Sequence, residues 1–295
     1  MSAVPNPIAR IRTRVGRTIF LRVAGQDGFA ARDRIHLTPG PRWFPPGSAV
    51  RMVHADAATF AGGLRALLLQ SLHPLAMAGV AGHSGYRSDP WGRLARTSTF
   101  LASTIFGTAD EARAAVDQVR SVHERIRGKT PDGVPYRASD PHLLTWVHAA
   151  EADSFLTTNQ HFGARRLSPA EADEYVAQLG RVAQAVGARD VPETVAELAD
   201  CLDRYRPELR ATPEALDTVR FLLHEPPLPG PVRAPYALLA AGAVATLPSW
   251  ARAELGLRRW PGGRPAHLAG RIAVGAIRWS LASTTMPSTP AAPRT

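Results

Sequence analysis

The sequence predicts an all-α fold built as a single multi-helix domain of about ten helices. The chain has 295 residues, of which 45% are hydrophobic and 20% are charged, a balance that is typical of a globular core and not of a disordered chain. Apolar residues recur at helical spacing, and we find no convincing run that alternates polar and apolar residues as strands do. Most of these helical stretches follow a recognisable N-terminal capping signal.

The two ends of the chain differ from its middle. Residues 1–45 are rich in arginine and proline, and Pro41, Pro45 and Pro46 forbid a continuous helix there, so we expect an irregular N-terminal arm. Residues 46–285 form the predicted helical domain. Residues 286–295 are rich in proline, threonine and alanine, which predicts a disordered tail.

The first predicted helices surround a small apolar segment. A helix is expected from Asp56 to Leu72, where Pro74 perturbs it. The following stretch LAMAGVAG, residues 75–82, is small and apolar and suits close packing. His73 precedes the proline, and we expect it to hold the broken helix end together. The stretch HSGYRSDP, residues 83–90, reads as a loop because of its Gly, Ser, Asp and Pro content.

Two capped helices follow. Asp89 with Pro90 begins a helix that runs to about Phe106, and Gly107 separates it from the next. That next helix starts with a capping box and ends at Gly128. The capping box consists of Thr108 and Glu111. The apolar face of the helix carries Val116, Val119, His123 and Ile126.

The remaining helix starts are marked by prolines. Asp140-Pro141 and Ser168-Pro169 are cap signals, the second one with Glu171 three residues after the serine. Later helices are expected to start at Pro192, Pro213 and Pro235, and an amphipathic stretch over residues 267–281 closes the fold.

The charge and cysteine content exclude several classes of protein. The formal charge is +10, but Lys129 is the only lysine and the arginines are scattered, so we expect no nucleic-acid partner. Cys201 stands alone, which rules out a disulfide framework, and its apolar neighbours indicate a core position. A single cysteine also rules out covalent haem attachment through Cys-x-x-Cys-His.

The apolar runs are too short to predict a secreted or membrane-spanning chain. The patch at residues 19–24 lacks the length and cleavage site of a signal peptide, and the run at residues 234–247 is shorter than the ~20 residues of a bilayer span. We expect a cytoplasmic protein without a transmembrane segment. Peripheral membrane contact through the basic arm or the apolar run stays open.

The strongest candidate chemistry is a haem b site. Such a site needs an axial imidazole, an apolar slot and cations near the propionates. His123 lies on the apolar stripe of its helix, and Arg93 and Thr97 share one face of the preceding helix with Arg96 close by. The competing interpretation makes His123 a core residue and has the arginines reach solvent or pair with carboxylates such as Asp89 or Glu111.

Several motifs in order resemble one oxygenase family. These motifs are RALLLQSLHPLAMAGVAGHS, DPWGRLART, SVHERIRG, YRASDPHLLTWVHA and LPSWARAELGL. Together they resemble the family of bacterial rubber oxygenases (latex clearing proteins) and fungal mpaB-type ER-bound oxygenases, over roughly residues 45–255. The resemblance implies an all-helical fold with a globin-like core that carries haem b and cleaves carbon–carbon double bonds with dioxygen.

The resemblance also assigns roles to individual residues. It makes His123 the proximal iron ligand, and it makes Arg93 and Thr97 a distal pair beside the haem. Arg96 stands where rubber oxygenases have a lysine, and an arginine that stays protonated is a poor iron ligand. On this basis Arg93, Arg96 and Thr97 are the candidate catalytic residues, and His123, Arg93 and Arg96 the candidate cofactor-binding residues.

One departure from the family pattern changes the expected substrate. LAMAGVAG contains no counterpart of the catalytic glutamate of rubber oxygenases. The resemblance therefore implies a haem-dependent oxygenase that uses dioxygen on a small apolar molecule, of isoprenoid or lipid type. Two alternatives stay open, a non-catalytic haem or lipid-binding protein on the same fold and a helical protein without a cofactor.

Overall fold

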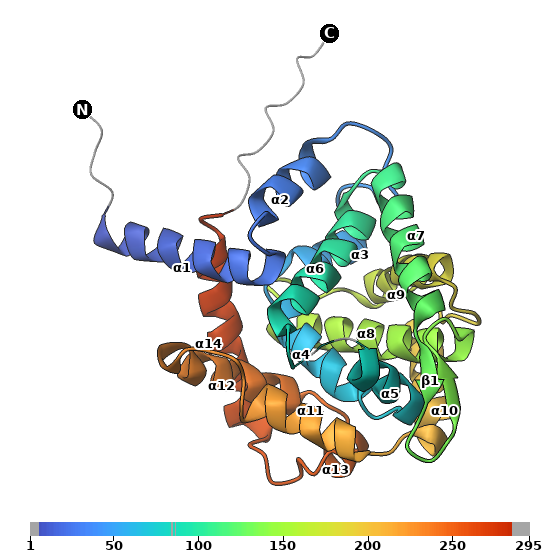
Figure 1. Cartoon of the computed structure of the whole chain (residues 1–295). Helices are drawn as coiled ribbons and strands as arrows, with labels where there is room; N and C mark the ends of the chain where they lie inside the picture. Colours follow the sequence, from blue (N-terminus) through green and yellow to red (C-terminus); the bar gives the residue numbers. More distant parts are fainter. Residues whose placement is uncertain (1–5, 84, 86, 285–295) are drawn as a thin grey trace.

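The computed structural model describes residues 6–83, 85 and 87–284, and within them the chain is almost entirely helical (Figure 1). The elements are α1 (Pro7–Ala24), α2 (Gly28–Leu37), α3 (Ala49–Ala55), α4 (Thr59–Gln70), α5 (Pro74–His83), α6 (Pro90–Phe106), α7 (Ala109–Arg125), β1 (Arg127–Lys129), β2 (Pro135–Arg137), α8 (Pro141–Phe162), α9 (Pro169–Val186), α10 (Val195–Tyr205), the 3-10 turn η1 (Arg206–Glu208), α11 (Pro213–Leu223), α12 (Gly230–Ala245), α13 (Ser249–Glu254) and α14 (Gly263–Leu281). The all-α prediction is confirmed, whereas the globin-like arrangement stays a prediction.

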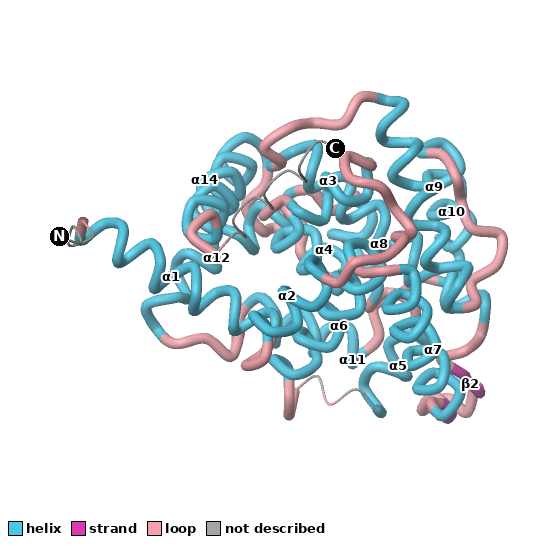
Figure 2. Tube along the Cα trace, turned by 90° about the horizontal axis from the view of Figure 1, so that it is seen from above, coloured by secondary structure: helices cyan, strands magenta, loops and turns pink. Residues whose placement is uncertain are grey.

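The core is centred on α4 and α8, which pack along each other inside the molecule (Figures 1 and 2). Arg65 of α4 is only 2% exposed. Its guanidinium lies 2.7 Å from the Asp153 carboxylate and donates to the Ser154 hydroxyl, both on α8, and to the Thr246 carbonyl oxygen after α12. A buried charge is tolerated when it is paired and fully hydrogen-bonded, so these contacts fix how α4, α8 and α12 fit together.

The sequence signals for helix starts are confirmed at four caps. The side chains of Asp89, Asp140, Thr108 and Ser168 each accept a hydrogen bond from a backbone N–H in the first turn of their helices. The last two form complete capping boxes with Glu111 and Glu171. Cys201 is 1% exposed, as expected of a core cysteine.

The prediction of an irregular N-terminal arm is wrong for most of its length. Asn6 caps α1 and Pro7 occupies its first turn, and α1 then packs against α14 and α6. Gly16 allows this contact, because a Cβ there would collide with the Ser280 backbone. Contacts with the far end of the chain thus stabilise a helix whose own sequence is rich in arginine. The three prolines fall after α2, in the irregular stretch before α3, and the tail at residues 286–295 lies outside the described residues.

Three further local predictions need correction. Pro192 does not start a helix, because α10 begins at Val195 with the Thr194 side chain as its cap. Pro235 does not start a helix but lies inside α12, where Pro231 occupies the first turn; the turn around Pro235 is exposed, so water can satisfy the carbonyl that proline leaves without a donor. Helix α7 ends at Arg125, before Gly128, and the following turn forms a two-stranded antiparallel hairpin. Tyr136 of β2 is buried against α5, which holds the hairpin in place.

Within the described residues, no single helix has the length and apolar content to cross a membrane. Helices α4 and α5 meet these criteria only as a pair, and they are bent by 109° at the break between them.

Helices α12 and α14 approach each other closely at Gly242 and Gly270. A Cβ on Gly270 would lie 2.9 Å from the Gly242 Cα atom and 2.8 Å from the Phe162 ring. We therefore expect Gly270→Ala to lower the free energy of unfolding by about 1–3 kcal/mol, because backbone cannot move aside as a flexible side chain can.

The matched control lies on the same helix. A Cβ on Gly275 meets no atom within 4 Å, so Gly275→Ala is expected to raise the free energy of unfolding by up to about 1 kcal/mol through its higher helix propensity. Urea denaturation of both variants measures these changes. Equal effects of the two substitutions would contradict close packing at Gly270.

Candidate functional site

The predicted site residues lie on the hairpin formed by α6 and α7. These helices are antiparallel neighbours, joined by Gly107 and the capping residue Thr108. Arg93 lies 14 residues before Gly107 and His123 lies 16 residues after it. At 1.5 Å per residue, both lie roughly 21–24 Å from the turn, so the hairpin brings Arg93 and His123 to the same level.

His123 occupies the last turn of α7 and is half-buried. Its Nδ1 atom is buried and has no hydrogen-bond partner among the described residues. Burial lowers the pKa of the imidazole, which favours the neutral ring that a metal ligand requires. A neutral imidazole with a free ring nitrogen is chemically competent as an axial ligand.

The three residues on α6 differ in their surroundings. Arg93 is half-buried, whereas Arg96 is exposed and pairs with the Asp89 carboxylate at 3.2 Å. The exposed Thr97 hydroxyl donates to the Arg93 carbonyl oxygen at 3.1 Å. The alternative prediction, in which Arg96 forms an ion pair with Asp89, is therefore confirmed. Within the described part of the chain, none of the three is hydrogen-bonded or ion-paired to His123.

A second group of polar side chains, to which the sequence analysis gives no role, lies between α3, α8 and α9. We call His54, His148, Glu151 and Tyr175 the α8–α9 polar cluster. The His54 and Tyr175 rings stack with centroids 6.1 Å apart, and the charge of Glu151 acts on Tyr175. His148 and Glu151 are three residues apart on α8 and share one face of it.

Burial perturbs the ionisation of every member of this cluster. It lowers the pKa of His54 to about 3 and that of His148 to about 4, so both rings are neutral near pH 7. It raises the pKa of Glu151 to about 7, and it raises the pKa of Tyr175 well above its usual value. Glu151 is thus a carboxyl group that can both accept and release a proton near neutral pH.

The cluster contains buried polar atoms that lack partners. His54 Nε2, His148 Nε2 and the Tyr175 hydroxyl make no hydrogen bond within the described residues, like His123 Nδ1. Such atoms are rare in folded proteins, because each costs about 1–3 kcal/mol unless a ligand or water satisfies it. They come from α3, α7, α8 and α9, and α9 packs against the other three helices. The region is therefore suited to a bound group that supplies polar partners.

Apolar side chains of α6 pack on the same core. Phe100, Leu101 and Phe106 are partly buried against it. Helix α6 also packs on α3, the helix that carries His54. Aromatic and aliphatic surface of this kind, together with a few polar atoms, is the usual composition of a cofactor or small-molecule site.

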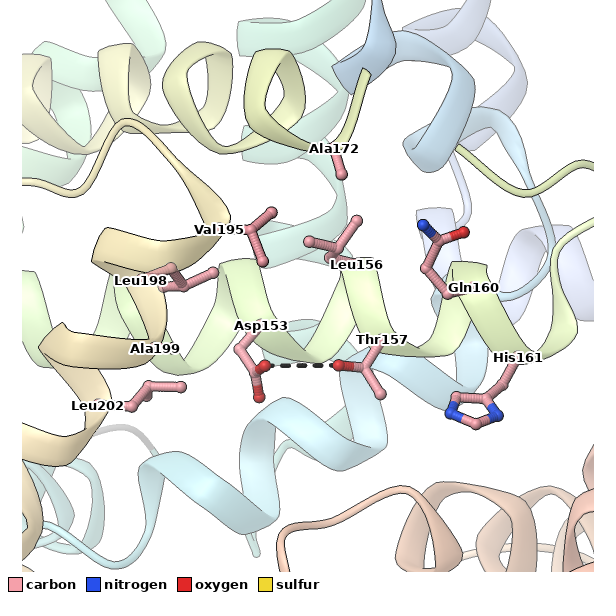
Figure 3. A pocket seen from close by; sticks show the side chains of 10 residues that line it. All are labelled: Asp153, Leu156, Thr157, Gln160, His161, Ala172, Val195, Leu198, Ala199 and Leu202. Carbon is pink, nitrogen blue, oxygen red and sulfur yellow. Dashed lines mark hydrogen bonds between the residues drawn. The ribbon is translucent and has the colours of Figure 1, made fainter. Parts of the chain in front are cut away.

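The cavity drawn in Figure 3 lies on the other side of α8, between α8, α9 and α10, and has a volume of about 330 Å³. Its wall includes Asp153, whose carboxylate accepts from the Thr157 hydroxyl at 3.4 Å and pairs with the buried Arg65. A second cavity, of about 500 Å³, is formed by α14 residues. Neither cavity is lined by His123 or by the α6 residues.

Comparison with known proteins identifies one family. The family described as "ER-bound oxygenase mpaB/B'/Rubber oxygenase, catalytic domain" matches residues 51–279. This range runs from α3 to α14 and includes the α6–α7 hairpin and the α8–α9 polar cluster. No curated protein and no solved structure matches the chain.

The raised pKa of Glu151 predicts a pH-dependent stability. Its folded pKa of about 7 exceeds the ordinary value of 4.5, so its contribution is complete below about pH 4.5 and is lost as the pH rises through 7. We expect Glu151→Gln to remove this loss. The free energy of unfolding of Glu151→Gln minus that of the unsubstituted protein should therefore increase by about 1–3 kcal/mol from about pH 5 to about pH 8.

Chemical denaturation at the two pH values measures this difference. His54 and His148 are present in both proteins, so the comparison removes the part of their titration that does not depend on Glu151. A pH-independent difference between the variant and the unsubstituted protein would contradict a raised pKa of Glu151.

Proposed function

We propose that this chain, which belongs to the family of mpaB and rubber oxygenase catalytic domains, is a haem b-dependent oxygenase that acts on a small apolar substrate. The observation that carries the proposal is the buried, unpartnered Nδ1 atom of His123 on the hairpin that also presents Arg93 and Arg96. An orphaned imidazole nitrogen in an oxygenase domain is suited to ligate iron.

The donor set fits haem b. His123 would hold the iron, the half-buried Arg93 and the exposed Arg96 would pair with propionates, and the apolar side chains of α6 would cover the ring. When bound, haem b supplies the activation of dioxygen. Arg96 stays protonated and so would not ligate iron; its contribution would be charge alone.

Glu151 supports a role in proton transfer. Its carboxyl group has a pKa of about 7 and lies among neutral histidines and Tyr175. A group that titrates near the working pH is effective as a general acid or base. We propose that Glu151 supplies the carboxylate that the LAMAGVAG stretch of α5, residues 75–82, lacks.

The apolar side chains of α6 support the proposed substrate class. Phe100 and Leu101 offer hydrocarbon surface on the helix that also carries Arg93 and Arg96. This composition favours an isoprenoid or lipid chain over a polar metabolite.

A non-catalytic haem or lipid carrier is the second candidate. The absence of any carboxylate on α5 favours it, because the helix that resembles the glutamate-bearing segment of rubber oxygenases carries none. Consumption of dioxygen with a polyprenoid substrate distinguishes the two, since a carrier retains the ligand without turnover.

Replacing His123 tests the iron ligand. His123→Ala is expected to reduce bound haem from about one per chain to a small fraction, while the circular dichroism of the helices stays unchanged. Pyridine haemochrome analysis of protein produced with adequate haem measures the stoichiometry. His83→Ala is the control, because His83 is an exposed imidazole on α5. Normal haem content in His123→Ala would disprove the assignment.

The two arginines are predicted to differ in their effect on haem affinity. Arg93→Ala is expected to raise the haem dissociation constant about 10- to 150-fold, since a half-buried charged hydrogen bond is worth about 1.5–3 kcal/mol. Arg96 is 66% exposed, and its loss should cost less than about 1 kcal/mol, or about fivefold. Haem titration followed by absorption measures both constants. An equal or larger effect at Arg96 would contradict this placement of the propionates.

A further inference from the structure

Three side chains that the proposed haem site does not use meet at the start of α8. His73 directly precedes α5, His142 lies in the first turn of α8, and Glu208 ends η1. One ligand atom from each lies within 4.8 Å of the others. We call these residues the His–Glu triad.

The distances from Glu208 to both histidines are close to those between ligands of one metal ion, and the two histidine nitrogens lie within 4.8 Å of each other. His142 Nε2 lies 2.9 and 3.0 Å from the two Glu208 oxygens, and His73 Nε2 lies 3.4 Å from Glu208 Oε2. Nitrogen and oxygen ligands about 2.0–2.1 Å from a tetrahedral ion lie roughly 3.3 Å apart. The triad therefore has ligand spacing before any ion is placed in it.

Tyr205 determines which nitrogen of His142 carries a hydrogen. The Tyr205 hydroxyl donates its one proton to the His142 carbonyl oxygen at 2.7 Å, so it can only accept from His142 Nδ1, which is 3.2 Å away. With the hydrogen on Nδ1, the Nε2 lone pair faces the Glu208 carboxylate at 2.9 Å, which is the arrangement that a shared metal ion would stabilise.

His73 brings a third, buried ligand atom to the same place. This residue is 2% exposed, its Nε2 atom lies 3.4 Å from Glu208 Oε2, and its Nδ1 atom has no hydrogen-bond partner within the described residues. A metal ion between His142 and Glu208 would bind His73 Nε2 as well, so that one ion would engage all three ligand atoms.

The surrounding backbone holds the triad together and leaves it accessible. The Arg210 N–H, two residues after Glu208, donates to the Leu72 carbonyl oxygen next to His73 at 2.9 Å. Trp146, one turn after His142, donates from its indole to the Gln70 carbonyl oxygen at 3.3 Å. The His142 and Glu208 side chains are 52% and 43% exposed, which gives an ion a path from solvent.

We propose that His73, His142 and Glu208 form a binding site for a divalent transition-metal ion, separate from the His123 site. Two imidazoles and one carboxylate are the ligands that Zn²⁺ and Fe²⁺ prefer, and they leave coordination positions for water or substrate. Tyr205 acts as a positioning residue that fixes the His142 ring, as acceptors of metal-bound histidines commonly do.

Cobalt(II) is the probe, because it replaces zinc and iron in such sites and is absent from haem. The full chain is incubated with Co²⁺, passed over a desalting column and subjected to elemental analysis, with visible d–d absorption bands as evidence of ordered coordination. We expect one Co²⁺ per chain that Zn²⁺ displaces. Glu208→Gln and His142→Ala should each weaken binding at least tenfold, and Tyr205→Phe about tenfold or more.

A matched pair of substitutions controls for surface binding. His224 and Glu225 are an exposed histidine and an exposed glutamate outside the triad, so His224→Ala with Glu225→Gln should leave cobalt binding unchanged. Because Glu208 and His142 are partly exposed, their variants are expected to fold even where His73→Ala does not. Equal Co²⁺ binding in Glu208→Gln, His142→Ala and the unsubstituted chain would overturn the proposal. Failure to retain any stoichiometric Co²⁺ would do the same.

Discussion

The buried guanidinium of Arg65 is the interaction on which the rest of the structure depends. It is nearly inaccessible to solvent, and it stays charged, so the fold must supply its partners. Asp153 and Ser154 of α8 and the Thr246 carbonyl oxygen supply them. A shift of α8 along α4 by even one residue would leave this charge unpaired. The pairing therefore sets both the register and the rotation of α8 about its axis.

The fixed rotation of α8 explains how one helix contributes to two groups of polar side chains. With Ser154 directed at Arg65, the neighbouring face that carries His148, Glu151 and Phe155 turns toward α3 and α9. The first turn of the same helix directs His142 at Glu208. The sites on α8 thus share a rigid element whose position is determined by a contact that belongs to neither, which is how precise sites are usually supported.

Several of the unpartnered polar atoms lie where we propose function. His123 Nδ1, the His54 and His148 Nε2 atoms, the Tyr175 hydroxyl and His73 Nδ1 are buried without hydrogen bonds inside the described part of the chain. A fold under selection for stability alone would remove such groups, because each one lowers the free energy of unfolding. The atoms around His123 and at the His–Glu triad are the ones for which we propose bound groups, whereas Ser48 and Asn159 carry unpartnered atoms outside both.

The sequence by itself determined the helical class, the helix starts capped by Asp89, Thr108, Asp140 and Ser168, the buried Cys201 and His123 as the leading candidate ligand. Each of these depends on residues within one or two turns of each other, so periodicity and capping chemistry reveal them. Only the tertiary structure decided that residues 7–24 are helical, that Glu151 is a near-neutral acid, and that Glu208 reaches His142 across 66 residues of sequence. Burial and long-range proximity arise from packing, which no local pattern encodes.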